Sequence, residues 1–163
     1  MSKNNIIIRE ITAADDTQIA EVIRSVLIEF GVPKVGTAYE DKALDCMTET
    51  YNKPTSIYFV VDKEGTIIGG AGIAQLENFK GNVCELQKMY FLPEARGIGL
   101  GKMMIEKCLN KAKDFGYESC YLETLPYMKA ATKLYTNSGF VSLDGPLGNT
   151  GHYSCNVWML KKL

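Results

Sequence analysis

The stretch YFLPEARGIGLGKMM, residues 90–104, places glycines between an apolar run and a run of helix-forming residues. Three glycines alternate here with larger side chains: Gly97, Gly99 and Gly101. The first N–H groups of a helix have no internal partner and carry a partial positive charge. Glycines let an anion approach that backbone, because no Cβ stands in the way. Together with the cations Arg96 and Lys102, the stretch predicts a phosphate-sized cradle where a strand turns into a helix.

Two familiar phosphate-binding loops do not fit this stretch. The Walker loop has the pattern G-x-x-x-x-G-K-[ST], but here Arg96 occupies the first glycine position and Met103 follows Gly101 and Lys102. The dinucleotide fingerprint G-x-G-x-x-G, begun at Gly97, needs a glycine where Lys102 stands. ATP and NAD are therefore poor candidates. Another kind of phosphate cradle and a tight turn without a ligand both remain open on spacing alone.

Hydrophobic periodicity on both sides of the cradle alternates between strand and helix spacing. Strands are expected at residues 5–11, 55–62, 66–77, 83–92, 118–125, 140–143 and 152–162. Helices are expected at residues 12–30, 40–51, 99–115 and 126–138. The order is β-α-α-β-β-β-α-β-α-β-β, which predicts a mixed α/β fold (an α+β mixed sheet) in a single domain spanning residues 1–163.

Three features predict how the middle strands are arranged. The turn KEG joins the strands at 55–62 and 66–77 into a hairpin. Glycines at positions 69, 70 and 72 weaken the second of these strands and indicate a β-bulge or a close neighbour. The helix between the strands at 83–92 and 118–125 predicts a right-handed crossover, so these two strands should be parallel.

The composition is that of an ordinary globular chain of 163 residues, with 46% hydrophobic and 23% charged residues. The net charge is −1 and no long basic block is present, so no nucleic-acid partner is expected. The five cysteines form no C-x-x-C pair and His152 is the only histidine, so no metal site is expected. Scattered cysteines indicate reduced, mostly buried thiols. Without a leader-like or membrane-spanning run, we expect a cytoplasmic location and no membrane partner.

The residues of the cradle resemble a known family. RGIGLG, residues 96–101, matches the R/Q-x-x-G-x-G/A motif of the GNAT superfamily of acyl-CoA-dependent N-acetyltransferases. The run ELQKMYFLPEARG resembles the family's fourth strand, and ATKLYTNSGF resembles a later helix that ends in Tyr135-x-x-x-Gly139-Phe140. The resemblance spans essentially the whole chain and is most specific over residues 83–140. It implies the GNAT-like acyl-CoA N-acyltransferase fold, whose element order is the one predicted above, and acetyl-CoA as co-substrate.

The resemblance assigns two main-chain segments to coenzyme A. In the family the loop holds the pyrophosphate through backbone N–H groups, and the fourth strand, which splays from the fifth, pairs with the pantetheine arm. One N–H of that strand polarises the thioester carbonyl as an oxyanion donor. The loop residues implied are Arg96, Gly97, Ile98, Gly99, Leu100, Gly101 and Lys102. The strand residues implied are Met89, Tyr90 and Phe91.

Tyr135 is, by resemblance, the general acid whose hydroxyl lies near the sulfur of coenzyme A. Its phenol is neutral at pH 7 because the reference pKa is about 10. A tyrosine that only packs in the core is the alternative. Family members often have Asn seven residues before this tyrosine, where Met128 stands here, so a side chain that usually supports the cofactor arm is missing.

Glu85 is the candidate general base for the acceptor ammonium. It lies among apolar neighbours on the predicted strand, a setting that can raise the pKa of a carboxyl group toward neutrality. An exposed strand glutamate, a glutamate paired with Lys88 or another cation, and proton transfer through water are the alternatives. Glu123, near the end of the next strand, is a second candidate base.

The acceptor site is expected, by resemblance, between residues 29–41 and residues 144–153. The candidate substrate-contacting residues are Phe30, Tyr39, Glu123 and His152. Aromatic side chains would form an apolar wall there and carboxylates would attract an amine, while a solvated loop and a structural histidine are the alternatives. The acceptor is expected to be either a small-molecule amine or a peptide amine. As to assembly, a homodimer is an open alternative to a monomer.

Two functions are therefore expected. The leading one is an acyltransferase that moves an acetyl group from acetyl-CoA to a primary amine by direct attack, with Glu85 or water as base and Tyr135 as acid. The alternative is a non-catalytic domain of the same fold that binds acyl-CoA as a sensor or interaction module. Direct attack needs neither a metal nor a covalent enzyme intermediate, so no cysteine is assigned as nucleophile.

Overall fold

Seven strands and four α-helices account for most of residues 5–126, 128–151 and 155–163, which the computed structural model describes. The strands are β1 (Ile6–Glu10), β2 (Ile57–Lys63), β3 (Thr66–Gln75), β4 (Val83–Phe91), β5 (Ser119–Thr124), β6 (Val141–Leu143) and β7 (Val157–Lys162). The helices are α1 (Asp16–Glu29), α2 (Met47–Thr50), α3 (Leu100–Asp114) and α4 (Lys129–Asn137). Short 3₁₀ turns lie at Ala13–Asp15, Ala38–Glu40, Lys42–Cys46 and Pro93–Ala95. The predicted mixed α/β fold class is confirmed.

All seven strands belong to one sheet, in the order β1-β2-β3-β4-β5-β7-β6. The hairpin predicted between β2 and β3 is present and antiparallel. β4 and β5 pair in parallel, as the crossover through α3 predicts. The remaining neighbouring strands are antiparallel. The parallel pair at the centre of the sheet is therefore the one place where the antiparallel alternation of the described strands is interrupted.

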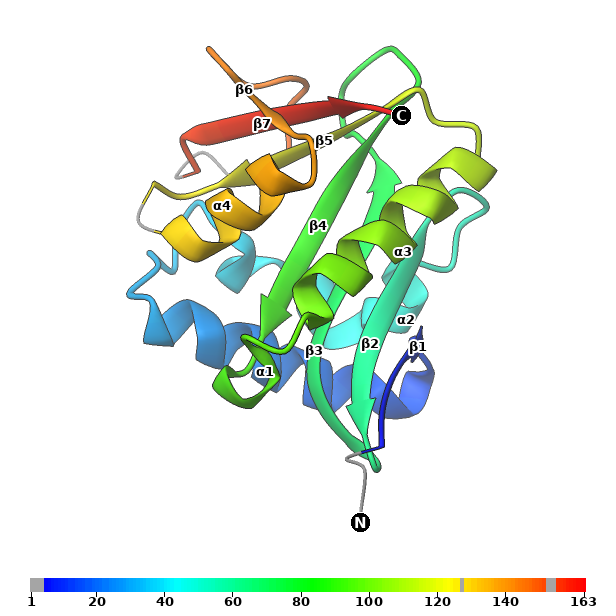
Figure 1. Cartoon of the computed structure of the whole chain (residues 1–163), viewed down its shortest axis with the longest axis vertical. Coiled ribbons are helices and arrows are strands. Elements are labelled where there is room, and N and C mark those ends of the chain that lie inside the picture. Colours follow the sequence, from blue (N-terminus) through cyan, green and yellow to red (C-terminus); the bar gives the residue numbers. More distant parts are fainter. Residues whose placement is uncertain (1–4, 127, 152–154) are drawn as a thin grey trace.

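Helices cover both faces of the sheet, with α3 and α4 on one face and α1 and α2 on the other (Figure 1). The buried side of α3 presents Met104, Ile105, Cys108, Leu109 and Ala112 to one core. The buried side of α1 presents Ile19, Val22, Ile23 and Leu27 to a second core. These positions recur at helical spacing, and each large side chain contributes about 1.5–3 kcal/mol on full burial. The two cores fix the helices against opposite faces of β4.

The helix predicted at residues 40–51 is wrong as a continuous helix. The segment forms two 3₁₀ turns and then the four-residue α2. Leu44 and Met47 are nevertheless completely buried, as their predicted apolar face requires. Residues three apart eclipse each other in a 3₁₀ turn, so this tighter backbone still directs both side chains into the core.

Two late boundaries also differ from the prediction. α4 begins at Lys129, and Pro126 stands in the turn before it instead of opening the helix. The last strand, predicted from residue 152, begins at Val157. Residues 152–154 lie outside the described part of the chain.

The start of the first helical segment matches its predicted capping signal. The Asp15 carboxylate accepts hydrogen bonds from the Thr12 backbone N–H at 2.8 Å and from its hydroxyl at 3.1 Å. Arg9 on β1 donates two further hydrogen bonds to the same carboxylate, at 2.8 and 2.9 Å. These bonds hold the pKa of the buried Asp15 below its usual range, with Arg9 as the main cause. The pair ties the edge strand to α1.

Candidate active site

β4 and β5 diverge after a short paired segment. Within the described residues, β4 pairs with β5 only at Val83, Cys84 and Glu85, and the rest of β4 pairs with β3 alone. This is the splay that the family resemblance implies. Two cavities lie beside the part of β4 that β5 leaves unpaired. The smaller one is lined by both β4 and β5, and the larger one by the end of β4, by the loop before α3 and by α4.

A bulge in β4 inserts an extra residue into the strand and so changes which side chains share the face that α1 covers. The register with β3 shifts between Gly70, which faces Tyr90, and Gly72, which faces Gln87. Lys88 lies in the bulge with φ of +50°, a left-handed conformation that lysine seldom adopts. Because strand residues alternate between faces, the extra residue lets Glu85, Gln87 and Tyr90 share the face that α1 covers.

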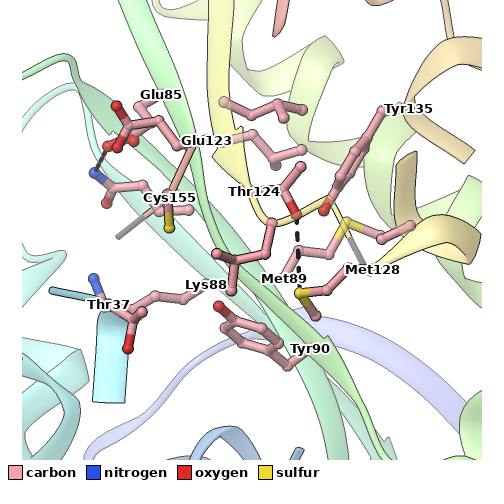
Figure 2. A pocket seen from close by; sticks show the side chains of 15 residues that line it. Thr37, Glu85, Lys88, Met89, Tyr90, Glu123, Thr124, Met128, Tyr135 and Cys155 are labelled. Atoms are coloured by element: carbon pink, nitrogen blue, oxygen red, sulfur yellow. Dashed lines mark hydrogen bonds between the residues drawn. The ribbon is translucent and has the colours of Figure 1, made fainter. Parts of the chain in front are cut away.

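The smaller cavity is named the acceptor cavity, after the acceptor site that the family resemblance implies. It is narrow, with a volume of about 60 Å³. Its lining comes from β4, β5, α4 and three loops (Figure 2). The polar and sulfur-bearing side chains among the lining residues are Thr37, Glu85, Gln87, Lys88, Met89, Tyr90, Glu123, Thr124, Met128, Tyr135 and Cys155. Two carboxylates and one ammonium therefore meet a small, mostly enclosed space.

The larger cavity is named the donor cleft, after the coenzyme A site that the resemblance implies. It is wider, with a volume of about 360 Å³. Its walls come from the end of β4, the loop before α3, the inner side of α4 and the end of α1. Predicted cofactor-binding residues that line it are Met89, Tyr90, Phe91, Arg96, Gly97, Gly99, Gly101 and Lys102. Ile98 projects from the same loop and is 56% exposed, and Leu100 is buried in the core beneath it. Most of the loop predicted from the sequence thus borders one cleft.

Five residues line both cavities and mark the junction between them. They are Met89, Tyr90, Met128, Ala131 and Tyr135. A molecule that lies in the donor cleft and one that lies in the acceptor cavity can meet only at this junction. It is the place where a group could pass from one to the other.

The three glycines of the loop serve two different purposes. Gly97 and Gly99 have φ of +74° and +84°, the left-handed region that suits glycine, and Gly99 is the N-cap of α3. Gly101 lies within the first turn of α3, where a Cβ would stand 2.7 Å from Cδ2 of Leu134 on α4. The first two glycines therefore shape the cradle, and the third lets α3 approach α4.

Arg96 is held on the α1 side of the loop. Its guanidinium donates to the Glu29 carboxylate at 2.7 and 2.9 Å, and its Nε donates to the Phe91 carbonyl at 3.0 Å. It also lies over the Phe30 ring, 5.1 Å from the ring centroid. The pair lowers the pKa of the Glu29 carboxyl, mainly through the hydrogen bonds from Arg96. Arg96 thus connects the cradle to the end of α1.

Tyr135 is 7% exposed and comes from α4. Its ring meets Phe140 edge to face, with ring centroids 6.1 Å apart. Burial raises the pKa of Tyr135 to about 12, so the phenol keeps its proton at neutral pH. The structure therefore sets a protonated hydroxyl at the junction of the two cavities.

Glu85 is 4% exposed, which excludes the alternative of an exposed strand glutamate. The Gln87 side chain donates to its carboxylate at 2.6 Å, and the Tyr51 hydroxyl donates to the Gln87 carbonyl oxygen at 2.6 Å. Because Tyr51 binds the oxygen of this amide, the amide nitrogen is turned toward Glu85. The three side chains form one oriented chain that ends at the acceptor cavity.

Lys88 is a largely buried cation on the same wall, with its side chain 8% exposed. Its ammonium lies 3.6 Å from the Asp41 carboxylate and 5.9 Å from the Tyr51 ring centroid. Burial lowers the pKa of Lys88, but Tyr51 and the carboxylates Asp41 and Glu85 outweigh it and raise the pKa above its ordinary value. Lys88 therefore remains charged and offsets one of the nearby carboxylates.

Glu123 anchors the loop that follows β6. One carboxylate oxygen accepts a hydrogen bond from the Tyr121 hydroxyl at 2.7 Å, and the other accepts one from the Thr150 hydroxyl. The Tyr121 oxygen in turn accepts the Leu147 backbone N–H at 3.2 Å. Glu123 lines the acceptor cavity, and it also holds the loop between β6 and β7 in place.

The other predicted substrate residues are placed differently. Phe30 lines the donor cleft and supports Arg96, so it is not part of the acceptor cavity. The Tyr39 ring lies beside Arg24 and Lys34 and does not line the acceptor cavity. His152 lies outside the described residues. Both aromatic predictions were drawn from the sequence positions of two loops, which do not reveal the direction of a side chain.

Four functional candidates were missed by the sequence reasoning. Tyr51 and Gln87 orient Glu85, while Thr37 and Cys155 line the acceptor cavity. Gln87 could have been found, because it lies two residues from Glu85 on the same strand face. Burial raises the pKa of the Cys155 thiol to about 12, so this thiol is a poor nucleophile at neutral pH.

Metal-binding and membrane-spanning features were sought in the same part of the chain. Across residues 5–126, 128–151 and 155–163, no three histidine, cysteine or acidic side chains cluster as a metal site. No helix there is both long and apolar enough to cross a bilayer.

Comparisons with known proteins agree with this geometry. The profile of the acetyltransferase (GNAT) family matches residues 21–140. The Escherichia coli protein named uncharacterized N-acetyltransferase YjgM is 42% identical over 158 residues, which cover 96% of this chain and 95% of that protein.

Solved structures share the fold. A GNAT-family acetyltransferase from Staphylococcus aureus superposes with a TM-score of 0.84 at 22% identity, covering 97% of this chain and 99% of the other. A phosphinothricin acetyltransferase from Sinorhizobium meliloti, solved with acetyl-CoA, superposes with a TM-score of 0.76 at 19% identity, covering 97% and 88%.

Proposed function

Because the chain belongs to the GNAT acetyltransferase family, we propose that it transfers the acetyl group of acetyl-CoA to a primary amine by direct attack. The family match covers residues 21–140, and the 42% identical relative carries the name of an N-acetyltransferase.

One observation carries the proposal: Tyr135 lines both the donor cleft and the acceptor cavity. Acyl transfer needs the thioester carbon, the attacking amine and a proton donor at one point. The junction provides a buried phenol whose pKa of about 12 keeps it protonated. A deep acyl-donor cleft that ended away from Tyr135 would not support this chemistry.

The donor cleft suits coenzyme A in shape and in polarity. Gly97 and Gly99 shape a loop that leads into the N-terminus of α3, where unpaired backbone N–H groups favour a pyrophosphate. Lys102 adds a cation at the start of that helix. The exposed edge of β4 after Glu85 offers main-chain groups to the pantetheine arm. Acetyl-CoA would supply the activated acetyl group at the junction.

The acceptor cavity suits an amine that arrives as an ammonium ion. Glu85, Glu123 and the nearby Asp41 give three carboxylates against the single described ammonium of Lys88. A cavity of about 60 Å³ has room for a few water-sized groups. It therefore admits the amine end of a small molecule or of a peptide side chain, while the rest of the acceptor lies outside.

Three proton transfers complete the reaction. Glu85 takes a proton from the ammonium, directly or through a water molecule, and the neutral amine attacks the thioester carbon. The carbon–sulfur bond breaks, and the departing sulfur takes the proton of the Tyr135 hydroxyl. The new amide nitrogen then gives up its extra proton, directly or through water, to the Tyr135 phenolate, which restores the hydroxyl. The charged ammonium of Lys88 interacts with Glu85 and stays protonated itself, because the nearby Tyr51 and carboxylates raise the pKa of Lys88.

A binding measurement followed by a turnover assay tests the proposal. Acetyl-CoA at about one hundred times its dissociation constant should stabilise the folded protein by about 2.7 kcal/mol in a thermal-shift experiment. A panel of aliphatic amines, amino acids and lysine-containing peptides should then give thiol release that depends on both substrates.

Two outcomes would contradict it. No thermal shift with acetyl-CoA would exclude the donor. Tight binding without thiol release from any amine, with Tyr135→Phe binding as well as the wild type, would instead favour a non-catalytic acyl-CoA-binding module.

A further inference from the structure

Tyr58 connects β2 to the bulge of β4 through its hydroxyl group. The side chain is completely buried, and its hydroxyl donates a hydrogen bond of 2.7 Å to the Lys88 carbonyl oxygen. β3 lies between β2 and β4 in the sheet. The ring of Tyr58 must therefore pass over β3 to reach the bulge.

Two glycines of β3 provide the space for that passage. A Cβ at Gly70 would lie 2.6 Å from Cε1 of Tyr58 and 2.7 Å from its hydroxyl oxygen. A Cβ at Gly72 would lie 2.5 Å from Cδ2 of the same ring. Each glycine inside a strand costs about 0.5–1 kcal/mol relative to alanine. Of the three glycines predicted to mark a bulge or a close neighbour, Gly70 and Gly72 flank the register shift and lie against Tyr58. A Cβ at the third, Gly69, would meet Phe91.

The hydrogen bond acts on a strained part of β4. Lys88 has φ of +50°, and a non-glycine residue in this left-handed region costs about 1–2 kcal/mol. Such a conformation persists only where surrounding contacts determine it. The Tyr58 hydroxyl is one of these contacts, and it binds the bulge residue itself.

The direction of the Lys88 carbonyl also sets the direction of the next N–H. A trans peptide is planar, with its carbonyl and N–H on opposite sides, and no cis peptide occurs among the described residues. The Met89 N–H therefore points away from Tyr58. Met89 belongs to the junction of the two cavities, on the part of β4 that β5 leaves unpaired.

We propose that Tyr58 is a positioning residue that fixes the Lys88–Met89 peptide so that the Met89 N–H faces the thioester carbonyl. This rests on the proposed function, since it assumes acetyl-CoA in the donor cleft. A donor that is already oriented stabilises charge on the carbonyl oxygen without reorganisation during the reaction. Tyr58 acts through the main chain and does not itself touch the substrate.

The test replaces Tyr58 by phenylalanine, which keeps the ring and removes only the hydroxyl. Tyr117→Phe is the matched control, because Tyr117 is also buried and donates a 2.8 Å hydrogen bond to the Thr55 carbonyl, away from both cavities. We expect kcat of Tyr58→Phe to fall about tenfold, less than the roughly 100- to 1000-fold loss from removing an oxyanion donor itself. The dissociation constant for coenzyme A, which has no acetyl carbonyl, should not change. Tyr117→Phe should keep wild-type kcat.

A second readout does not depend on turnover. The carbonyl carbon of ¹³C-labelled acetyl-CoA should shift downfield on binding to the wild type, because a hydrogen bond polarises the carbonyl. In Tyr58→Phe the resonance should return toward its position in free acetyl-CoA, and in Tyr117→Phe it should not.

These measurements distinguish the proposed acetyl transfer from the positioning role of Tyr58. If the wild type bound acetyl-CoA with the carbonyl shift but acetylated no amine, and only Tyr58→Phe lost the shift, the proposed function would be contradicted and the role of Tyr58 supported. A wild-type carbonyl resonance identical to that of free acetyl-CoA would overturn the positioning role, even if Tyr58→Phe failed to fold. Equal kcat and equal carbonyl shifts in Tyr58→Phe and Tyr117→Phe would overturn it as well.

Discussion

Tyr135 shows how burial can prepare a single residue for proton donation. Its pKa of about 12 means that the phenol remains protonated throughout the range in which amines lose their protons. A proton donor becomes ineffective only when it has lost its proton, which for this group happens above about pH 12. We therefore predict that kcat rises with pH and then stays level to pH 10. A pH profile at saturating acetyl-CoA measures this.

The contrary result is specific. A fall in kcat with a midpoint near pH 9, present in the wild type and absent from Tyr135→Phe, would mean that the phenol titrates in that range.

Gln87 links Glu85 to Tyr51 through two side-chain hydrogen bonds. It holds Glu85 and is itself held by Tyr51, each through a 2.6 Å hydrogen bond. Gln87→Met keeps the length of the side chain and removes both bonds. Leaving buried polar partners unsatisfied costs about 1–3 kcal/mol, and Glu85 would lose its orientation. We predict a kcat several-fold lower with unchanged affinity for coenzyme A, measured by steady-state kinetics and calorimetry.

Gln75 supplies the control. It lies on β3 and its side chain donates to the Gly81 carbonyl at 3.1 Å in an exposed position. If Gln87→Met and Gln75→Met reduced kcat equally, the orienting role of Gln87 would be wrong.

At the scale of elements, the cradle and α1 are joined by Arg96 and Glu29. We predict that Arg96→Glu weakens coenzyme A binding at least tenfold, because a carboxylate would then stand beside the N-terminal backbone proposed to bind the pyrophosphate. Glu29→Gln should change the affinity less than about threefold, since ion pairs between exposed side chains contribute little. Calorimetric titration with coenzyme A measures both variants. Equal losses would show that the ion pair, and not the charge in the loop, determines binding.

The sequence predicts the elements that hold the donor better than those that shape the acceptor site. The alternation of strand and helix periods locates β4, the loop and α3, and the crossover rule gives the parallel pair with β5. The bulge carries no such signal, because lysine has no preference for the left-handed conformation of Lys88. Arg96 meets a residue 67 positions away, which no local pattern indicates. For the same reason, the direction of a side chain in a loop cannot be predicted from the local sequence. Phe30 and Tyr39 are examples, because neither lines the acceptor cavity.

At the scale of the whole molecule, the pair between Arg9 and Asp15 should make stability depend on pH. Asp15 has a folded-state pKa below its usual value, chiefly because of the hydrogen bonds from Arg9. A lowered pKa contributes stability that is complete above the unfolded-state value near 4 and is lost as the pH falls through the folded-state value. We predict that Asp15→Asn is less stable than the wild type at pH 7. The difference should shrink below pH 4, in urea unfolding followed at several pH values.

Asp144→Asn, in the late loop, is the comparison for this change, because it also replaces one carboxylate by an amide. A stability gap between Asp15→Asn and the wild type that stayed constant from pH 7 to pH 3 would contradict the assignment.

The most direct test of the account compares kcat for acetyl transfer in Tyr135→Phe and in Tyr117→Phe at saturating acetyl-CoA and acceptor amine. Both changes remove one hydroxyl from a buried tyrosine, but only Tyr135 lies at the junction of the two cavities. General acid catalysis contributes about 100- to 10,000-fold, so we predict at least a 100-fold fall for Tyr135→Phe, unchanged affinity for coenzyme A and wild-type turnover for Tyr117→Phe. Equal turnover in the two variants would contradict the central claim that the Tyr135 hydroxyl protonates the departing sulfur.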